Sequence, residues 1–252
     1  MIPDPFRMDG KVVVVTGASS GLGARFAEVL AAAGASLVLA ARRQDAVEKL
    51  ASRLPGAIGA RCDVTDESDC VALVERTMQE HGRIDVLVNN AGVSNVARAE
   101  DETTETFRQV VEVNLVATYT LSRLVGIQML KAGRGNVVNV ASMVGLVGLG
   151  RMPQASYAAS KAGVVNLTRE LAAQWARKGV RVNALAPGFF PTEMTNELFG
   201  TDTGQAWMEK MTPMGRGGRL EELDGALLYL ASEASSYATG SIVTVDGGWT
   251  AV

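Results

Sequence analysis

The sequence predicts a single α/β domain in which helices cover both faces of a doubly wound, parallel sheet of seven strands. Short runs rich in β-branched residues alternate with longer amphipathic runs along the whole chain, the pattern of repeated strand–helix–strand units. Several short runs are apolar without alternation, as expected for strands buried on both faces. The length of 252 residues suits one sheet, and no linker or repeat divides residues 1–252.

The predicted elements follow directly from these runs. The seven strands are expected at residues 12–15, 36–40, 57–61, 86–89, 136–141, 180–186 and 241–245. The helices between them are expected at residues 24–33, 45–54, 67–80, 103–130, 156–178 and 220–231. Residues 189–219 carry the weakest pattern, and a loop of that length inside a compact domain is usually functional, so we expect a substrate-binding loop or lid there.

Composition excludes several classes of function. The 24 basic and 27 acidic residues are interspersed, so no basic stripe is available for nucleic acid. Residues 1–11 lack the basic patch and the following apolar run of a signal peptide. The longest uncharged stretch, residues 135–150, is short for a membrane span. Cys62, Cys70 and the single His81 do not stand at metal-ligand spacing. We therefore expect a cytoplasmic protein with no metal, membrane or nucleic-acid partner.

A glycine-rich turn joins the first predicted strand to the first helix. Glycines at such a junction let the backbone approach a pyrophosphate, and the helix N-terminus offers free N–H groups to an anion. A tight turn can also need glycines only for its backbone conformation. The turn alone therefore does not distinguish a phosphate-binding site from an ordinary tight turn. We expect the phosphate-binding residues to be Gly17, Ser19, Ser20, Gly21, Leu22 and Gly23.

The residues after the second strand indicate which dinucleotide binds. NAD-binding folds place an acidic residue here for the ribose hydroxyls, whereas this chain has Arg42 and Arg43. Guanidinium groups match a 2′-phosphate, so NADP(H) is the preferred cofactor. The two arginines could instead begin a solvated helix, which leaves NAD(H) possible.

Tyr157 and Lys161 form the strongest chemical signal, because residues four apart share one face of a helix. Oxidising an alcohol, or reducing a ketone, requires an acid/base whose pKa lies near working pH. A tyrosine pKa of about 10 must fall by about three units, which costs roughly 4 kcal/mol. A cation about 4 Å away supplies about 4 kcal/mol at an effective dielectric of about 20. Ser142 follows the strand at 136–141 and should emerge at the ligand-binding edge of the sheet.

These motifs, in this order, resemble those of the short-chain dehydrogenase/reductase family, and in particular its 3-oxoacyl-acyl-carrier-protein reductases. The shared patterns are T-G-x-x-x-G-x-G from Thr16, N-N-A-G from Asn89, Ser142, Y-x-x-x-K from Tyr157 and P-G-x-x-x-T from Pro187. The resemblance spans residues 10–248. It implies a Rossmann fold and an oxidoreductase that transfers a hydride between NADP(H) and a small carbonyl compound or secondary alcohol.

The resemblance also assigns roles to individual residues. It implies a catalytic set of Asn114, Ser142, Tyr157 and Lys161, in which Tyr157 is the general acid/base, Lys161 lowers its pKa and Ser142 orients the substrate oxygen. It implies that the rest of the cofactor contacts Asp63, Val64, Asn90, Ala91, Gly92, Pro187, Gly188, Phe190 and Thr192, with Tyr157 and Lys161 beside the nicotinamide and its ribose. The spacing from Ser142 to Tyr157 is two residues longer than usual in the family, which affects the expected shape of the substrate pocket.

Two other functions remain open at this point. The chain could be a dinucleotide-binding sensor or scaffold without turnover, because a fold alone does not establish catalysis. It could also be a non-redox enzyme of the same superfamily. The family further implies a homo-oligomer, a tetramer or dimer, in which the helices beginning near Thr103 and Ser156 pair across a twofold axis. Apolar residues around the expected pocket favour an apolar substrate, although they could simply pack the 189–219 segment onto the domain.

Overall fold

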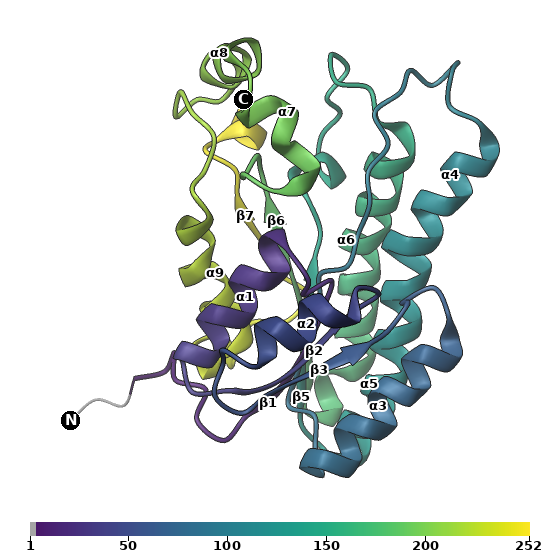
Figure 1. Cartoon of the computed structure of the whole chain (residues 1–252), viewed down its shortest axis with the longest axis vertical. Coiled ribbons are helices and arrows are strands. Elements are labelled where there is room, and N and C mark those ends of the chain that lie inside the picture. Colours follow the sequence, from purple (N-terminus) through teal and green to yellow (C-terminus); the bar gives the residue numbers. More distant parts are fainter. Residues whose placement is uncertain (1–3) are drawn as a thin grey trace.

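The computed structural model describes residues 4–252 and contains one parallel sheet in the order β3-β2-β1-β4-β5-β6-β7 (Figure 1). The strands are β1 (Val12–Thr16), β2 (Ser36–Ala41), β3 (Ala57–Arg61), β4 (Val86–Asn89), β5 (Gly135–Val140), β6 (Val180–Pro187) and β7 (Ile242–Val245). The chain runs outward from β1 to β3, returns to β4, and then runs outward in the other direction. This confirms the predicted doubly wound sheet of seven parallel strands.

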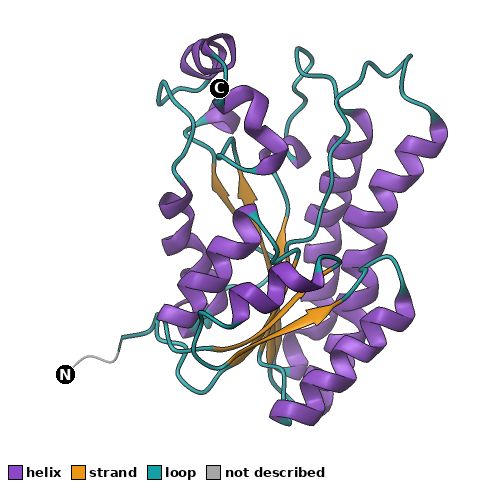
Figure 2. Ribbon diagram, in the orientation of Figure 1, coloured by secondary structure: helices purple, strands orange, loops and turns teal. Residues whose placement is uncertain are grey.

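Helices cover both faces of the sheet (Figure 2). One layer contains α1 (Gly21–Ala32), α2 (Gln44–Ala51) and α9 (Asp224–Ala231), whose apolar side chains pack on residues such as Val13 and Val15 of β1. The other contains α3 (Glu67–His81), α5 (Ala117–Ala132) and α6 (Ala155–Trp175), which pack on Val14 and its neighbours. Successive β1 side chains thus enter opposite cores, which explains the unbroken apolar run in the sequence.

The long predicted helix at 103–130 consists of three joined segments. They are α4 (Thr104–Val111), a π-helical turn (Glu112–Val116) and α5. By length and composition the continuous run Thr104–Ala132 could cross a membrane. Its buried residues, including Leu121, Val125 and Met129, instead pack against the sheet and α6, so this is a core helix with one outward face.

The segment 189–219 is more regular than its sequence indicates. It contains α7 (Asn196–Phe199) and α8 (Asp202–Met211), joined through Thr201, whose hydroxyl accepts a hydrogen bond from the Gly204 amide at 3.2 Å. Both helices lie beyond the carboxyl ends of β6 and β7 (Figure 1). The segment therefore stands above the edge at which an open α/β sheet binds ligands.

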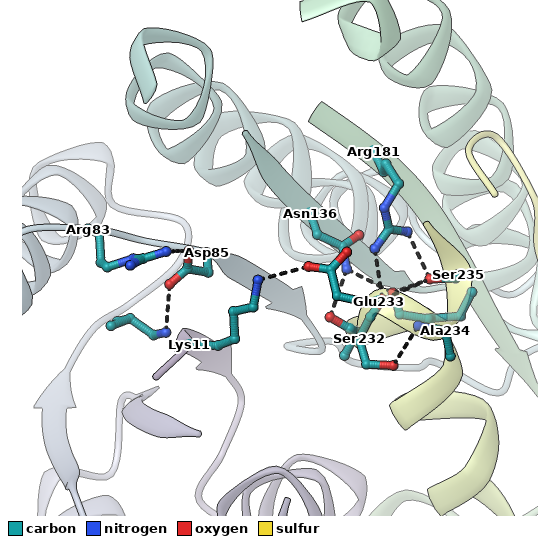
Figure 3. Close-up of polar contacts among 12 residues, drawn as sticks. Lys11, Arg83, Asp85, Asn136, Arg181, Ser232, Glu233, Ala234 and Ser235 are labelled. Carbon is teal, nitrogen blue, oxygen red and sulfur yellow. Dashed lines mark hydrogen bonds and ion pairs between the residues drawn. The ribbon is translucent and has the colours of Figure 1, made fainter. Parts of the chain in front are cut away.

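The amino edge of the sheet carries charged groups that pair within the protein (Figure 3). Asp85, which precedes β4 and is 7% exposed, accepts a hydrogen bond from the Val12 amide at 2.9 Å and forms an ion pair with Arg83. Lys11 forms an ion pair with Glu233 at 2.8 Å. The Asp85 contact fixes the start of β1 against the start of β4, and the Lys11 ion pair ties it to the turn after α9.

Two further side chains tie the same edge to the end of α9. Arg181 of β6 donates to the Ser232 carbonyl at 3.0 Å and to the Ser235 hydroxyl at 2.8 Å. Asn136 of β5 donates to the carbonyls of Leu230 and Ala231. Helix carbonyls that the end of α9 leaves without intrahelical partners are satisfied in this way.

Candidate active site

A cavity of about 730 Å³ opens along the carboxyl edge of the sheet, from the end of β2 across the first turn to the end of β6. Its size lies within the usual range for ligand and cofactor sites. Nearly all the residues singled out in the sequence line it: Gly17, Ser19, Ser20, Gly21, Leu22, Arg42, Arg43, Asp63, Val64, Asn90, Ala91, Gly92, Ser142, Tyr157, Lys161, Pro187, Gly188, Phe190 and Thr192. Gly23 and Asn114 do not line it, for separate physical reasons.

The glycine turn is built for close backbone approach. Gly17 and Gly21 have φ angles of 63° and 54°, which L side chains rarely adopt. A Cβ on Gly23 would lie 2.3 Å from the Gly17 carbonyl oxygen, so Gly23 permits helix–strand packing beneath the turn rather than contact with the cavity. Asn90 fastens the turn by donating to the Thr16 carbonyl at 2.9 Å.

Polar contacts hold β4 beside this turn. The Thr16 hydroxyl accepts from the amides of Asn90 and Ala91 at 3.0 and 3.1 Å. A Cβ on Gly17 would lie 2.9 Å from the Ala91 Cα, so the two backbone segments approach as closely as glycine allows. The motifs from Thr16 and from Asn89 are therefore parts of one structure, although the sequence separates them by more than 70 residues.

Basic groups lie at the outer end of the cavity. Arg42 and Arg43 follow β2, and Asp63 follows β3. Asp63 accepts from the amide and the hydroxyl of Thr65, and these bonds, more than the nearby Arg42 charge, lower its pKa. Asp63 thus shapes the turn after β3 and also faces the cavity.

The groups expected to carry proton transfer come together at the inner end. Ser142 follows β5, and its hydroxyl lies close enough to Tyr157 of α6 to affect the pKa of that phenol. Lys161, one helical turn later, is 4% exposed and donates from Nζ to the Val140 carbonyl at 2.8 Å. Its Nζ lies 5.7 Å from the centre of the Tyr157 ring. Helix α6 therefore presents both side chains to the end of β5, as the four-residue spacing predicts.

The electrostatics of this cluster without cofactor differ from the sequence expectation. Burial raises the pKa of Tyr157, and the nearby Ser142 hydroxyl only partly opposes that effect. Burial also lowers the pKa of Lys161 to about 8. The lowering of the tyrosine pKa expected from Lys161 is thus not found, and desolvation sets the direction of the shift in the free protein. At neutral pH, Lys161 is still protonated in most protein molecules.

Asn114 lies in the π-helical turn and is fully buried. Its Oδ1 accepts from the Val93 amide, and its Nδ2 donates to the Val93 carbonyl and to the Ser160 hydroxyl, each at 2.9 Å. Gly92 makes room for this arrangement, since a Cβ there would lie 3.2 Å from Asn114 Oδ1 and 3.5 Å from Lys161 Nζ. Asn114 holds the loop after β4 against α6, and its catalytic role stays a prediction.

Two carboxylates near the site were not identified from the sequence. Glu102 accepts from the amide and hydroxyl of Ser156, at the start of α6, and from Asn95 at 2.8 Å. Glu193 lines the cavity and pairs with Arg43. Neither residue stands in a local motif, because each meets its partners only through the folding of distant segments.

The aromatic residues above the inner end form a packed cluster. Phe189, Trp207 and Trp249 lie with ring centres 5.2 to 5.4 Å apart. Met143, Val144 and the Tyr157 ring join the same cluster. Much of the apolar surface expected at the pocket mouth therefore packs the 189–219 segment onto the domain. This agrees with the alternative that these residues serve packing and do not by themselves indicate an apolar substrate.

Comparison with known proteins identifies the family. Residues 17–250 match the family model described as enoyl-(acyl carrier protein) reductase. The chain is 43% identical to a galactitol 2-dehydrogenase (L-tagatose-forming) from Cereibacter sphaeroides, over 97% of each chain. It is 39% identical to a 3-oxoacyl-acyl-carrier-protein reductase from Thermotoga maritima, over 96% of this chain and 98% of the relative.

A solved structure gives the same result. The crystal structure of a gluconate 5-dehydrogenase from Burkholderia cenocepacia, in complex with NADP and tartrate, is similar with a TM-score of 0.93 and 35% identity, over 99% of this chain and 98% of that one. The fold and the site thus define a dehydrogenase or reductase of the Rossmann class. The chain belongs to the short-chain dehydrogenase/reductase family, whose members are oxidoreductases. This confirms the resemblance seen in the sequence motifs.

Proposed function

We propose that the protein transfers a hydride between NADP(H) and a carbonyl compound or secondary alcohol, with Tyr157 as the proton carrier. One observation carries the proposal: a single cavity joins a phosphate-binding turn at one end to Ser142, Tyr157 and Lys161 at the other. A dinucleotide that spans this cavity brings its nicotinamide to the proton-transfer groups.

The cavity fits such a cofactor in shape and charge. The positive φ angles of Gly17 and Gly21 and the close packing of Gly17 on Ala91 leave a bare backbone surface at the N-terminus of α1. Arg42 and Arg43 supply positive charge where a 2′-phosphate would lie, which favours NADP(H), with NAD(H) possible. The NADP bound to the Burkholderia cenocepacia relative supports this choice.

The remaining cofactor contacts follow from position in the cavity. Asp63 and Val64, after β3, would hold the adenine end, and Asn90, Ala91 and Gly92 would lie along the middle. The residues after β6 would hold the nicotinamide end, with Lys161 on the ribose. These residues are Pro187, Gly188, Phe190 and Thr192.

The proton chemistry assigns one task to each inner residue. When bound, the nicotinamide supplies or accepts the hydride, and its oxidised form adds positive charge. Tyr157 holds or releases the proton at its hydroxyl, and Ser142 donates a hydrogen bond to the substrate oxygen as negative charge develops there. Lys161 stabilises the phenolate form. Because burial raises the Tyr157 pKa in the free protein, we infer that the shift toward neutrality occurs only in the cofactor complex.

A direct screen tests this function. NADPH oxidation should be measured against ketones, ketoses, keto acids and acyl thioesters, and NADP⁺ reduction against the matching alcohols and polyols. The proposal predicts turnover of at least one class and tighter binding of NADPH than of NADH. A protein that binds neither nucleotide in a fluorescence titration would contradict the proposal, whereas binding without turnover would support a sensor.

We also propose the setting in which this enzyme works. The outward face of α4, the π-helical turn and α5 carries four apolar or aromatic side chains that are 37 to 47% exposed: Phe107, Val116, Tyr119 and Ile127. Burying this apolar face against a second copy would give a twofold dimer, or a tetramer built from dimers, in the cytoplasm. The segment 189–219 would serve as a lid over the substrate. Sedimentation showing a monomer at micromolar concentration would contradict the oligomer.

A further inference from the structure

Glu193 places a negative charge at the mouth of the phosphate-binding turn. It is the first residue of a short 3-10 turn (Glu193–Thr195) in the 189–219 segment. Its carboxylate accepts a hydrogen bond from the Ser20 hydroxyl at 2.9 Å and pairs with the Arg43 guanidinium, with Arg43 Nη2 3.3 Å from Oε2. Three segments that are far apart in the sequence therefore meet at one carboxylate.

The guanidinium of Arg43 is already occupied in the free protein. Its Nη2 donates to the Ser20 hydroxyl at 2.6 Å and to the Ser19 hydroxyl at 3.0 Å, and its Nη1 lies 3.4 Å from Glu193 Oε1. In residues 4–252, by contrast, no ion pair involves Arg42. Of the two arginines expected to meet a 2′-phosphate, Arg43 is thus the one that Glu193 holds.

The N-terminus of α1 explains why a carboxylate is stable there. The first turn of α1 contains no acidic residue, and the Ser20 side chain caps none of its amides. A helix N-terminus stabilises negative charge, and Glu193 is held beside the N-terminus of α1 by its hydrogen bond with Ser20. The hydrogen bonds with Arg43 and Ser20 accordingly lower the pKa of Glu193.

The turn that carries Glu193 is held firmly. Thr195 accepts a hydrogen bond from the Thr192 amide at 3.0 Å, and its hydroxyl donates to the Phe190 carbonyl. Glu193 therefore keeps its place beside Arg43 through contacts of the segment, not only through its own flexible side chain. A phosphate arriving at Arg43 therefore meets a like charge.

We infer that Glu193 is a residue that determines cofactor specificity, by occupying Arg43 as a carboxylate stand-in for phosphate. The inference rests on the proposed function, because it needs the cavity to bind a nicotinamide dinucleotide. A dinucleotide with a 2′-phosphate has to compete with Glu193 for Arg43, whereas one with a free 2′-hydroxyl can bind while that ion pair stays intact. Glu193 thus narrows the preference for NADPH over NADH that Arg42 and Arg43 create.

The test is a pair of fluorescence titrations, with NADPH and with NADH, on the full chain and on Glu193→Gln. An exposed ion pair is typically worth a factor of about two to five in an equilibrium constant, so NADPH should bind about two to five times more tightly to Glu193→Gln. The Kd for NADH should stay within about twofold, and the gain for NADPH should shrink as salt screens the charges. Glu197→Gln, an exposed carboxylate in α7 of the same segment, is the matched control and should change neither Kd.

A second comparison isolates the contact itself. In an Arg43→Met background, Glu193→Gln should no longer change the ratio of the two dissociation constants. With Arg43 present, an equal gain for NADPH and NADH from Glu193→Gln, weaker binding of both, or an unchanged ratio would overturn the inference while leaving the proposed function intact. Failure of the parent protein to bind either nucleotide would instead overturn the proposed function.

Discussion

The two edges of this sheet use charged residues in opposite ways. At the amino edge, Asp85 is buried and Arg181 is half-buried, and both bond to backbone groups, hydroxyls or opposite charges within the chain. At the carboxyl edge, Lys161 is as deeply buried as Asp85, yet within residues 4–252 its ammonium group has one hydrogen-bond acceptor, the Val140 carbonyl, and faces a cavity. The buried charge of Asp85 is thus compensated by an opposite charge and a backbone amide, whereas the buried charge of Lys161 is only partly compensated.

The difference shows where the fold accepts an energetic cost. A buried ammonium with one acceptor is less stable than a solvated one, and the pKa of about 8 for Lys161 records that penalty. A site that needs a cation beside a phenol must retain it. We therefore expect substitutions at the amino edge to alter stability and those at the carboxyl edge to alter turnover.

The largest loss of stability should come from Asp85→Ala. This change removes the acceptor for the buried Val12 amide and the partner of Arg83, which should lower the free energy of unfolding by about 2–4 kcal/mol. Turnover per folded molecule should not change. Urea unfolding measures the effect, and Lys11→Met, which removes an ion pair from the same edge at a more exposed site, serves as the control and should cost less than about 1 kcal/mol. Equal losses of stability from Asp85→Ala and Lys11→Met would contradict the claim that the buried Asp85 contacts stabilise this edge.

Lys161→Met should have the reverse profile. Turnover should fall by about 100-fold or more, because the phenolate loses its nearest cation. Stability should hold or rise by about 1–2 kcal/mol at pH 7, since lowering the lysine pKa from 10.5 to about 8 costs about 3 kcal/mol, of which the lost hydrogen bond to Val140 offsets a part.

The pH dependence gives this prediction its sign. The folded pKa of Lys161 lies below the unfolded value, so the unfolded chain binds more protons between about pH 8 and pH 10.5. The parent should therefore gain stability relative to Lys161→Met as pH rises through that window. Lys131→Met, at an exposed lysine in the last turn of α5, should show no such trend. A parent that loses stability relative to Lys161→Met over this range would contradict the assignment.

The smallest effect is expected from Glu102→Gln. The neutral amide keeps the shape of the contact with Ser156 but removes negative charge from the N-terminus of α6, which should cost about 0.5–1 kcal/mol. Turnover should fall about two- to fivefold, because α6 carries Tyr157. Glu100→Gln, at an exposed residue of the same loop, is the control and should change neither quantity.

Sequence reasoning reached the fold because its signals are local. Strands buried on both faces require apolar runs, and the turn after β1 requires glycines, so periodicity and motif spacing were sufficient. The π-helical turn at Glu112–Val116 escaped prediction because an extra residue per turn leaves no mark on an apolar helix pattern. Helices α7 and α8 escaped because Gly and Thr are frequent in that segment, and tertiary packing overrides their weak helix propensity.

The candidate site divides in the same manner. Tyr157 and Lys161 share a helix face, so their proximity follows from spacing alone. Glu193 meets Arg43 across 150 residues, and Glu102 meets Ser156 across 54, so neither contact could be inferred without the fold. The effect of burial on Tyr157 was also hidden, because desolvation depends on everything that packs around the ring.

The central claim is that the Tyr157 hydroxyl carries the proton at the carboxyl edge. Tyr157→Phe removes that oxygen and leaves the ring in its apolar cluster. With the best carbonyl substrate from the screen, turnover should fall by about 10²–10⁴-fold while the Kd for NADPH stays within about twofold. A Tyr157→Phe protein that retains more than about a tenth of the parent turnover would contradict the account.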